Sequence, residues 1–233
     1  MNVIITGATK GMGRAIAEKF AGAGYSLIVC ARSKEDLEEM KKEFYERFPA
    51  ISIQTMVADI GDIDQVKDFG RWILEFGFTP EILVNNAGYF IPGNIYNEED
   101  GILQKMMEVN LNSAYHLTRL LLPVMMEKKK GHIFNICSIA SFKPMANVGA
   151  YGISKFALYG FTKHLREEMK RYEIKVTAVC PGATYTSSWE QSDINPSRLL
   201  EADDVAKTVF ACSQLSATAV VEDIIIRPQL GDL

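Results

Sequence analysis

A tyrosine and a lysine four residues apart, Tyr151 and Lys155, are the side chains of this sequence best suited to acid chemistry. On a helix the two side chains share one face. An unperturbed tyrosine titrates near ~10, and a neighbouring ammonium favours the phenolate and lowers the pKa of the phenol. Ser138, earlier in the same stretch, could add a hydroxyl hydrogen bond to the group that Tyr151 protonates. This arrangement predicts protonation of a carbonyl oxygen as it becomes an alcohol.

A tyrosine and a lysine at this spacing also occur on many solvated helix faces, so the pair gains weight only with a hydride donor elsewhere in the chain. A helix is favoured here because apolar side chains recur at near-helical spacing after Tyr151. These side chains are Phe156, Ala157, Tyr159, Phe161, Leu165 and Met169.

The first turn of the chain indicates that donor. A β-branched run at residues 3–5 precedes the glycine-rich turn Gly7-x-x-x-Gly11-x-Gly13, and a helical stretch follows from Arg14. Glycines in a strand–turn–helix unit let the backbone approach a pyrophosphate, and the helix N-terminus offers free N–H groups to phosphate. The turn therefore predicts a dinucleotide cofactor, although a glycine cluster by itself also fits a simple tight turn. The residues expected to contact the cofactor here are Gly7, Thr9, Lys10, Gly11, Met12 and Gly13.

Charge at the end of the second expected strand favours NADP(H) over NAD(H). An acid at this point would bind the ribose 2′-hydroxyl of NAD, but the sequence reads Ala31-Arg32-Ser33. Arg32, together with Lys10 inside the glycine turn, suits a 2′-phosphate. The alternative is that Arg32 simply faces solvent.

Composition indicates an ordinary globular protein. Of 233 residues, 48% are hydrophobic and 23% are charged, and the net charge of -4 gives no basic excess for a nucleic-acid partner. The cysteines form no C-x-x-C pair, which favours buried free thiols, and the histidines lack the spacing of metal ligands. We see no targeting segment and no apolar run long enough to span a membrane, so we expect a cytoplasmic protein.

Strand-like runs alternate with helical stretches, as in a parallel sheet with crossover helices. The expected strands cover residues 3–5, 26–31, 51–60, 81–84, 132–137, 175–180 and 222–227. Expected helices include residues 62–76, 98–129 with a break near 110–112, and 202–215, while residues 183–200 look like a loop. The predicted fold class is α/β: a Rossmann-type, doubly wound, seven-stranded parallel sheet with helices on both faces, in one domain of residues 1–233.

Together these features resemble the short-chain dehydrogenase/reductase family in its single-domain form, over nearly the whole chain. The motifs that carry the resemblance are Thr6-Gly-x-x-x-Gly11-x-Gly13, Asp59, Asn85-Asn86-Ala87-Gly88, Asn110, Ser138, Tyr151-x-x-x-Lys155 and Pro181-Gly182. The resemblance implies that Tyr151, Lys155 and Ser138 are catalytic. It also implies that Asn110 kinks the long helix and holds a water in a proton relay to Lys155.

The same resemblance implies further cofactor contacts along the chain. Lys155 would hold the nicotinamide ribose beside Tyr151. The other implied contacts are Asp59 and Ile60 at the adenine, Asn86, Ala87 and Gly88 at the adenosine ribose and sheet centre, and Pro181, Gly182, Thr184 and Thr186 around the nicotinamide.

The expected function is NADPH-dependent reduction of a ketone or aldehyde to an alcohol. The compact tail resembles that of bacterial sepiapterin-reductase-like members, so a sepiapterin- or diketone-like substrate is one candidate. Apolar and aromatic pocket candidates are Tyr89, Phe90, Phe142, Met145, Tyr185 and Trp189. Glu190 or Asp193 could bind a cationic group or could simply be solvated.

Two other functions stay open. A 3-oxoacyl-carrier-protein reductase would need a basic patch for its acidic carrier, to which Lys143 and Arg198 could contribute. A catalytically silent NADP-binding scaffold or sensor would keep the fold without turnover. The resemblance also implies a homodimer or homotetramer that pairs through residues 100–129 and 150–172. The apolar positions expected to be exposed for this pairing are Leu117, Leu121, Phe161 and Leu165.

Overall fold

Seven parallel strands form one sheet in the order β3-β2-β1-β4-β5-β6-β7. The computed structural model describes residues 1–186 and 194–232. The strands are β1 (Asn2–Thr6), β2 (Ser26–Ala31), β3 (Ile53–Val57), β4 (Ile82–Asn85), β5 (Gly131–Ile136), β6 (Ile174–Pro181) and β7 (Asp223–Ile226). The predicted doubly wound α/β fold is confirmed, and β3 is shorter than the run of residues 51–60 that the sequence favours.

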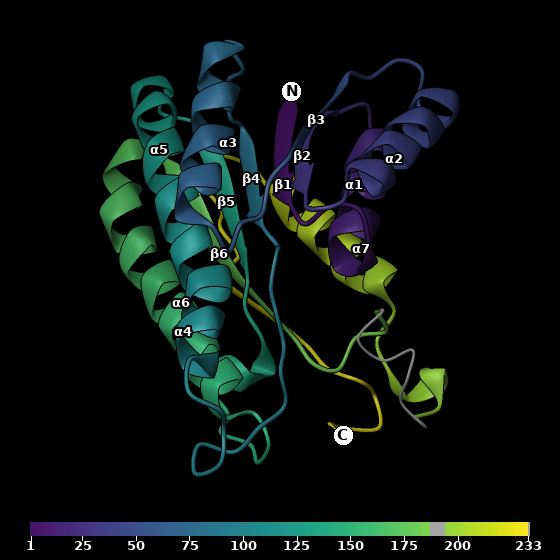
Figure 1. The fold of residues 1–233 in the computed structure, drawn as a ribbon. Helices are drawn as coiled ribbons and strands as arrows, with labels where there is room; N and C mark the ends of the chain where they lie inside the picture. Colours follow the sequence, from purple (N-terminus) through teal and green to yellow (C-terminus); the bar gives the residue numbers. More distant parts are fainter. Residues whose placement is uncertain (187–193, 233) are drawn as a thin grey trace.

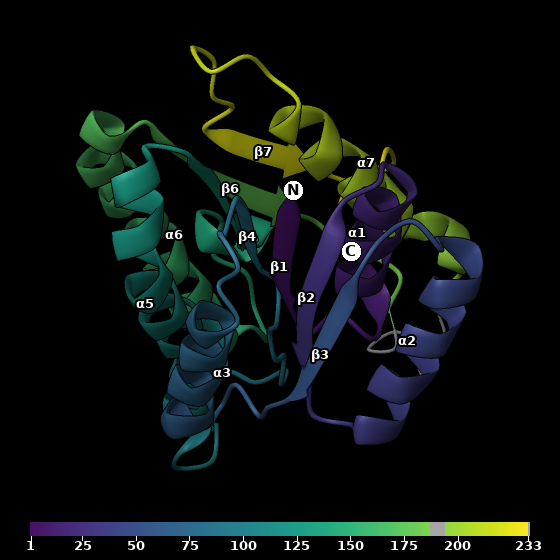
Figure 2. The same ribbon diagram turned by 90° about the horizontal axis from the view of Figure 1, so that it is seen from above.

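Helices cover both faces of the sheet, as Figures 1 and 2 show from two directions. One layer holds α1 (Gly11–Gly22), α2 (Lys34–Arg47) and α7 (Ala202–Ser213). The other holds α3 (Ile63–Glu75), α5 (Ser113–Lys128) and α6 (Gly149–Met169), with the short α4 (Ile102–Met107) before α5. The break predicted within residues 98–129 is confirmed: a π-helical turn, Glu108–Asn112, separates α4 from α5.

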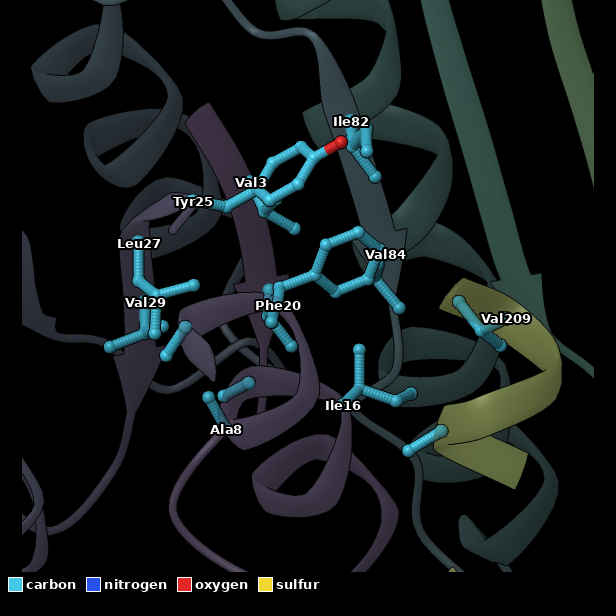
Figure 3. Close-up of a cluster of buried hydrophobic side chains, with 14 of the residues drawn as sticks. Val3, Ala8, Ile16, Phe20, Tyr25, Leu27, Val29, Ile82, Val84 and Val209 are labelled. Carbon is cyan, nitrogen blue, oxygen red and sulfur yellow. The ribbon is translucent and has the colours of Figure 1, made fainter. Parts of the chain in front are cut away.

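The core between the sheet and the layer of α1, α2 and α7 is built around Phe20 (Figure 3). The Phe20 ring meets the rings of Tyr25 and Phe210 edge-on, with centroids 5.2 and 5.3 Å apart. Burying one such side chain contributes about 1.5–3 kcal/mol. Because helices cover both faces, strands such as β2 are buried on both sides, which explains their continuous apolar runs.

The core on the opposite face corrects one expectation. The sequence predicts exposed side chains at Leu117, Leu121 and Leu165, but these side chains are only 1%, 0% and 4% exposed. They pack between the helices that carry them, α5 and α6, and the sheet. The prediction is wrong because both helices turn this stripe toward the sheet. On their outer side, α5 and α6 form a groove of about 530 Å³ that Met126 and the half-buried Phe161 help to line.

The carboxyl ends of β1, β4, β5 and β6 meet at one edge of the sheet, toward the lower end of the view in Figure 1. The strand order reverses between β1 and β4, and open α/β sheets bind ligands at such a switch point.

The four cysteines are free and buried, as predicted. Within residues 1–186 and 194–232, no helix is long and apolar enough to cross a membrane.

Candidate active site

The turn between β1 and α1 has a backbone shape that requires glycine at three positions. Gly7 and Gly11 have φ angles of 64° and 56°, in the left-handed region that favours glycine. A side chain at Gly13 would bring its Cβ within 2.2 Å of the Gly7 carbonyl oxygen. Helix α1 begins without a side-chain cap from Lys10, so no side chain at its N-cap occupies its first N–H groups. A turn with this shape and these donors fits a pyrophosphate.

Asn86 connects the end of β4 to the glycine turn. Its side-chain amide donates to the carbonyl oxygens of Thr6 at 2.9 Å and Gly7 at 3.0 Å. The Thr6 hydroxyl in turn accepts from the backbone N–H groups of Asn86 at 3.1 Å and Ala87 at 3.0 Å. These bonds fix the sheet centre, while contacts of Asn86, Ala87 and Gly88 with a ribose stay a prediction.

Lys155 is a buried cation on α6, with only 4% of its surface exposed. Its Nζ donates to the Ile136 carbonyl oxygen at 2.8 Å, at the end of β5. A Cβ placed on Gly88 would lie 3.4 Å both from this Nζ and from Oδ1 of Asn110. The loop after β4, the helix break and α6 therefore converge at the ammonium. Burial lowers the pKa of Lys155 to about 8.

Tyr151 lies one helical turn before Lys155, whose Nζ is 5.7 Å from the centre of the phenol ring. Burial raises the pKa of Tyr151, and a hydrogen bond from Ser138 opposes this rise. The predicted lowering of this pKa is not found in this structure, because burial of the phenol is the largest influence on it. A phenol with a raised pKa keeps its proton through neutral pH, as a proton donor must.

Ser138 follows β5 by two residues and is 8% exposed. Its Oγ accepts the backbone N–H of Ala140 at 3.1 Å, which begins the 3₁₀ turn Ile139–Ser141. An oxygen that accepts in this way keeps its own hydroxyl proton free to donate. The strand end and the turn thus hold the hydroxyl beside Tyr151.

Asn110 sits in the π-helical turn and is 2% exposed. Its Oδ1 accepts the backbone N–H of Tyr89 at 2.7 Å, and its Nδ2 donates to the Tyr89 carbonyl oxygen at 3.0 Å and to Ser154 Oγ at 2.9 Å. Asn110 therefore joins the loop after β4 to the helix that carries Tyr151. Single π turns are frequent at functional sites, and the implied water relay stays a prediction.

The segment after β6 folds over the glycine turn. A Cβ on Gly11 would lie 3.0 Å from the Thr186 methyl group. The Thr184 hydroxyl donates to the Gly182 carbonyl oxygen at 2.9 Å and is nearly buried. Pro181 ends β6, and contacts of these residues with a nicotinamide stay a prediction. Trp189, Glu190 and Asp193, named as substrate candidates, lie outside the described residues.

Other candidate contacts are spread along the same edge. Asp59 is exposed, and its Oδ1 accepts the backbone N–H of Gly61 at 2.9 Å. Ile60 helps to line a cavity of about 240 Å³ beside it. Among the pocket candidates, Phe90 meets the Tyr151 ring edge-on with centroids 4.9 Å apart. Phe142 lies instead beside Tyr159, with centroids 6.2 Å apart. Tyr89, Met145 and Tyr185 lie at or near the surface of this region.

A sequence model described as short chain dehydrogenase matches residues 1–196. This chain belongs to the short-chain dehydrogenase family. Sepiapterin reductase of Chlorobaculum tepidum is 33% identical over 239 residues, which cover 99% of this chain and 97% of that protein. An uncharacterized oxidoreductase of Staphylococcus epidermidis is 29% identical over 227 residues, 97% of this chain and 96% of that one.

Solved structures of short-chain dehydrogenases are similar over nearly the whole length. A metagenomic short-chain oxidoreductase in complex with NADP has a TM-score of 0.85 and 28% identity, with 98% of this chain and 97% of that chain covered. L-sorbose reductase from Gluconobacter frateurii, complexed with NADPH and L-sorbose, has a TM-score of 0.90 and 26% identity, with 97% and 95% covered. The family and these relatives together support an oxidoreductase activity.

Two acids of this short-chain dehydrogenase contact the site region without having been singled out by the sequence. Asp36, in the first turn of α2, pairs with Lys10 at 2.8 Å, while Arg32 is exposed. Glu98 contacts the start of α6. Asp36 lies in the first turn of α2, and Glu98 lies a few residues before α4 in the chain. Acids are common at such positions, so neither residue stands out in the sequence. The signal that distinguishes them is a contact through space, which one sequence does not contain.

Proposed function

We propose that this protein reduces a ketone or aldehyde to an alcohol with NADP(H), as one catalytic domain of residues 1–233. The observation that carries the proposal is the convergence of Tyr151, Lys155 and Ser138 at the carboxyl edge of the sheet, beside the loop that follows β4. The relatives named with NADP or NADPH in their structures support the choice of cofactor.

The chain's own residues supply the acid half of this reaction. Bound NADPH supplies a hydride to the carbonyl carbon. Tyr151 holds its proton at neutral pH and donates it to the carbonyl oxygen, while the Ser138 hydroxyl orients that oxygen. The Lys155 ammonium, fixed by the Ile136 carbonyl, favours the phenolate that remains after proton transfer. General acid assistance of this kind contributes ~10²–10⁴-fold in rate.

The residues that we expect to bind the cofactor lie at the same edge of the sheet. The uncapped start of α1 and the turn at Gly7, Gly11 and Gly13 would hold the pyrophosphate. Arg32 would bind the 2′-phosphate together with Lys10, which would have to exchange its pair with Asp36 for the phosphate, so we expect NADPH to be preferred over NADH. The expected contacts beyond these are Thr9, Met12, Asp59, Ile60, Asn86, Ala87, Gly88, Pro181, Gly182, Thr184 and Thr186.

The direct test is oxidation of NADPH against a panel of diketones, acyl thioesters, pterins and steroids. Tyr151→Phe should lower turnover ~10²–10⁴-fold because the general acid is lost, while NADPH binding measured by fluorescence stays unchanged. Tyr96→Phe, at a tyrosine that is 86% exposed, is the matched control. A Tyr151→Phe enzyme close to the wild-type rate would rule out this role, and a preference for NADH would overturn the cofactor assignment.

One contact weighs against a 3-oxoacyl-carrier-protein reductase. Lys143, one of the two cations that could bind an acidic carrier, pairs with Asp232 at 2.8 Å. Arg227 and Lys143 together lower the pKa of Asp232 to about 2, so this carboxylate stays charged and offsets the lysine. Turnover of acyl thioesters alone would favour the carrier-protein alternative. Cofactor binding with no turnover across the panel would favour a scaffold or sensor.

Pairing of two or four copies through α5 and α6 is part of the proposal. The groove on the outer side of these helices, lined in part by Met126 and Phe161, supports it. Sedimentation at micromolar concentration should give a dimer or a tetramer, and a monomer would count against it.

A further inference from the structure

Helix α6 begins without a cap of its own. Its N-cap residue is Val148, whose side chain has no hydrogen-bond acceptor, at a position where Ser, Thr, Asp or Asn is common. The first N–H groups of the helix instead bind another segment. The Gly149 N–H donates to the Gly93 carbonyl oxygen at 2.9 Å. The Ala150 N–H donates to the carboxylate of Glu98, at 2.9 Å to Oε1 and 3.2 Å to Oε2.

The surroundings of Glu98 leave room for this side chain. A Cβ on Gly149 would lie 2.9 Å from Glu98 Oε1, and a Cβ on Gly93 would lie 2.7 Å from Glu98 Cγ. Beside them, the Asn94 side-chain amide donates to Asn147 Oδ1 at 2.6 Å, and the Asn147 N–H donates to Asn94 Oδ1 at 2.9 Å. Two glycines thus leave room for the carboxylate, and the pair of asparagines joins the segment of Glu98 to the residues just before α6.

The segment of residues 89–98 that carries Glu98 also contacts the acid-bearing side of the site. Phe90 packs edge-on against the Tyr151 ring. The backbone of Tyr89 is bound on both its N–H and its carbonyl oxygen by Asn110. This segment therefore contacts Tyr151 directly through Phe90, and it contacts the residue before Tyr151 through Glu98.

We infer that Glu98 is a positioning residue for Tyr151, an inference that rests on the proposed function. Its carboxylate replaces the missing cap of α6, and a negative charge at a helix N-terminus is favourable. The bond to Ala150 fixes the first turn of α6, and so fixes the direction in which the next residue presents its phenol. Glu98 itself touches neither Tyr151 nor the reacting carbonyl in this role.

The test compares Glu98→Ala with Glu99→Ala, a neighbouring exposed acid, on the fastest carbonyl of the panel. Glu98→Ala should lower kcat about 10- to 100-fold, the scale expected when a reacting group is misplaced by about 1 Å. The Kd for NADPH should stay within twofold in both variants. Glu98→Gln keeps an acceptor for the Ala150 N–H and should recover most of the rate. Glu99→Ala should behave as the wild type.

A second arm separates positioning from general damage. If Glu98 acts through the phenol, Glu98→Ala should cause no further loss when the Tyr151→Phe change is already present. An equal fractional loss in both backgrounds would overturn the inference, as would a kcat for Glu98→Ala within twofold of the wild type.

Amide hydrogen exchange of the intact chain tests the contact without any turnover. Exchange of residues 149–152 should be faster in Glu98→Ala than in the wild type or Glu99→Ala. Equal protection in all three would overturn the inference even in a fully active enzyme. Failure of the wild type to reduce any carbonyl would instead defeat the proposed function, and with it the role of Glu98 toward an acid.

Discussion

Helix α6 carries two buried cations, and only one of them is paired with carboxylates. Lys155 is 4% exposed and Arg166 is 5% exposed. Arg166 donates from Nε to the Val176 carbonyl oxygen at 2.9 Å, and its guanidinium pairs with Asp223 at 3.1 Å and Glu222 at 3.4 Å. These bonds attach the second half of α6 to β6 and β7.

Lys155 donates to one backbone carbonyl, and no carboxylate of the described residues lies within ion-pair distance of it. A buried charge without an opposite charge is costly, and burial accordingly lowers the pKa of Lys155 to about 8. An arginine cannot release its proton in this way. From this difference we infer that Arg166 stabilises the fold, and the cost of burying Lys155 fits the catalytic role proposed for it beside Tyr151.

The largest effect we expect from this comparison is that of Lys155→Met on activity. Turnover of NADPH should fall ~10²–10⁴-fold, because the cation that favours the phenolate is lost. The free energy of unfolding should stay level or rise, since an uncompensated buried charge is replaced by an apolar chain of similar length. Steady-state kinetics and urea unfolding measure the two quantities. A large loss of stability with activity retained would reverse the roles assigned to the two cations.

Arg166→Met should do the opposite. Removing the guanidinium leaves Asp223 and Glu222 without their cationic partner, although Asp223 still accepts from the Tyr159 hydroxyl. We expect a loss of about 2–3 kcal/mol, below the about 3–5 kcal/mol of a fully buried pair because both carboxylates are partly exposed. The kcat per folded molecule should be unchanged. Lys42→Met, at an exposed lysine of α2, is the control in urea unfolding. A loss no larger than that of the control would show that these pairs contribute little.

The fold was largely predictable because its signals are local. Apolar runs such as residues 26–31, the glycines at positions 7, 11 and 13, and the spacing of the helices all act over a few residues. The exposure of Leu117 and Leu165 was not predictable, because periodicity shows that a helix has an apolar stripe and not which neighbour covers it. Helices α5 and α6 turn that stripe toward the sheet.

The candidate site was predictable in its members and less so in its energetics. Tyr151, Lys155, Ser138 and Asn110 lie at one edge of the sheet, as expected from their positions after strands or on helices at that edge. The direction of the Tyr151 pKa shift depends on whether burial or the nearby cation dominates, and the sequence contains neither quantity. Glu98 could not be assigned to α6 because its partner Ala150 is 52 residues away.

The smallest effect we expect is a difference in how stability depends on pH. In the folded protein Lys155 has a pKa of about 8, below its ordinary value of 10.5. Between these two values the unfolded chain still binds a proton that the folded chain has released, so this group makes the protein more stable as pH rises. The unfolding free energy of the wild type minus that of Lys155→Met should therefore increase from pH 8 to pH 10, by up to ~1.4 kcal/mol per unit.

Arg166 provides the matched reference for this measurement, since a guanidinium stays protonated across the same range. The wild type minus Arg166→Met should stay level where the Lys155 difference rises. Other lysines titrate in both members of each pair, so their contributions cancel in the subtraction. A flat Lys155 difference would mean that water or a charge outside the printed contacts compensates the ammonium. The contrast between the two cations would then lie in their partners and not in their energetic cost.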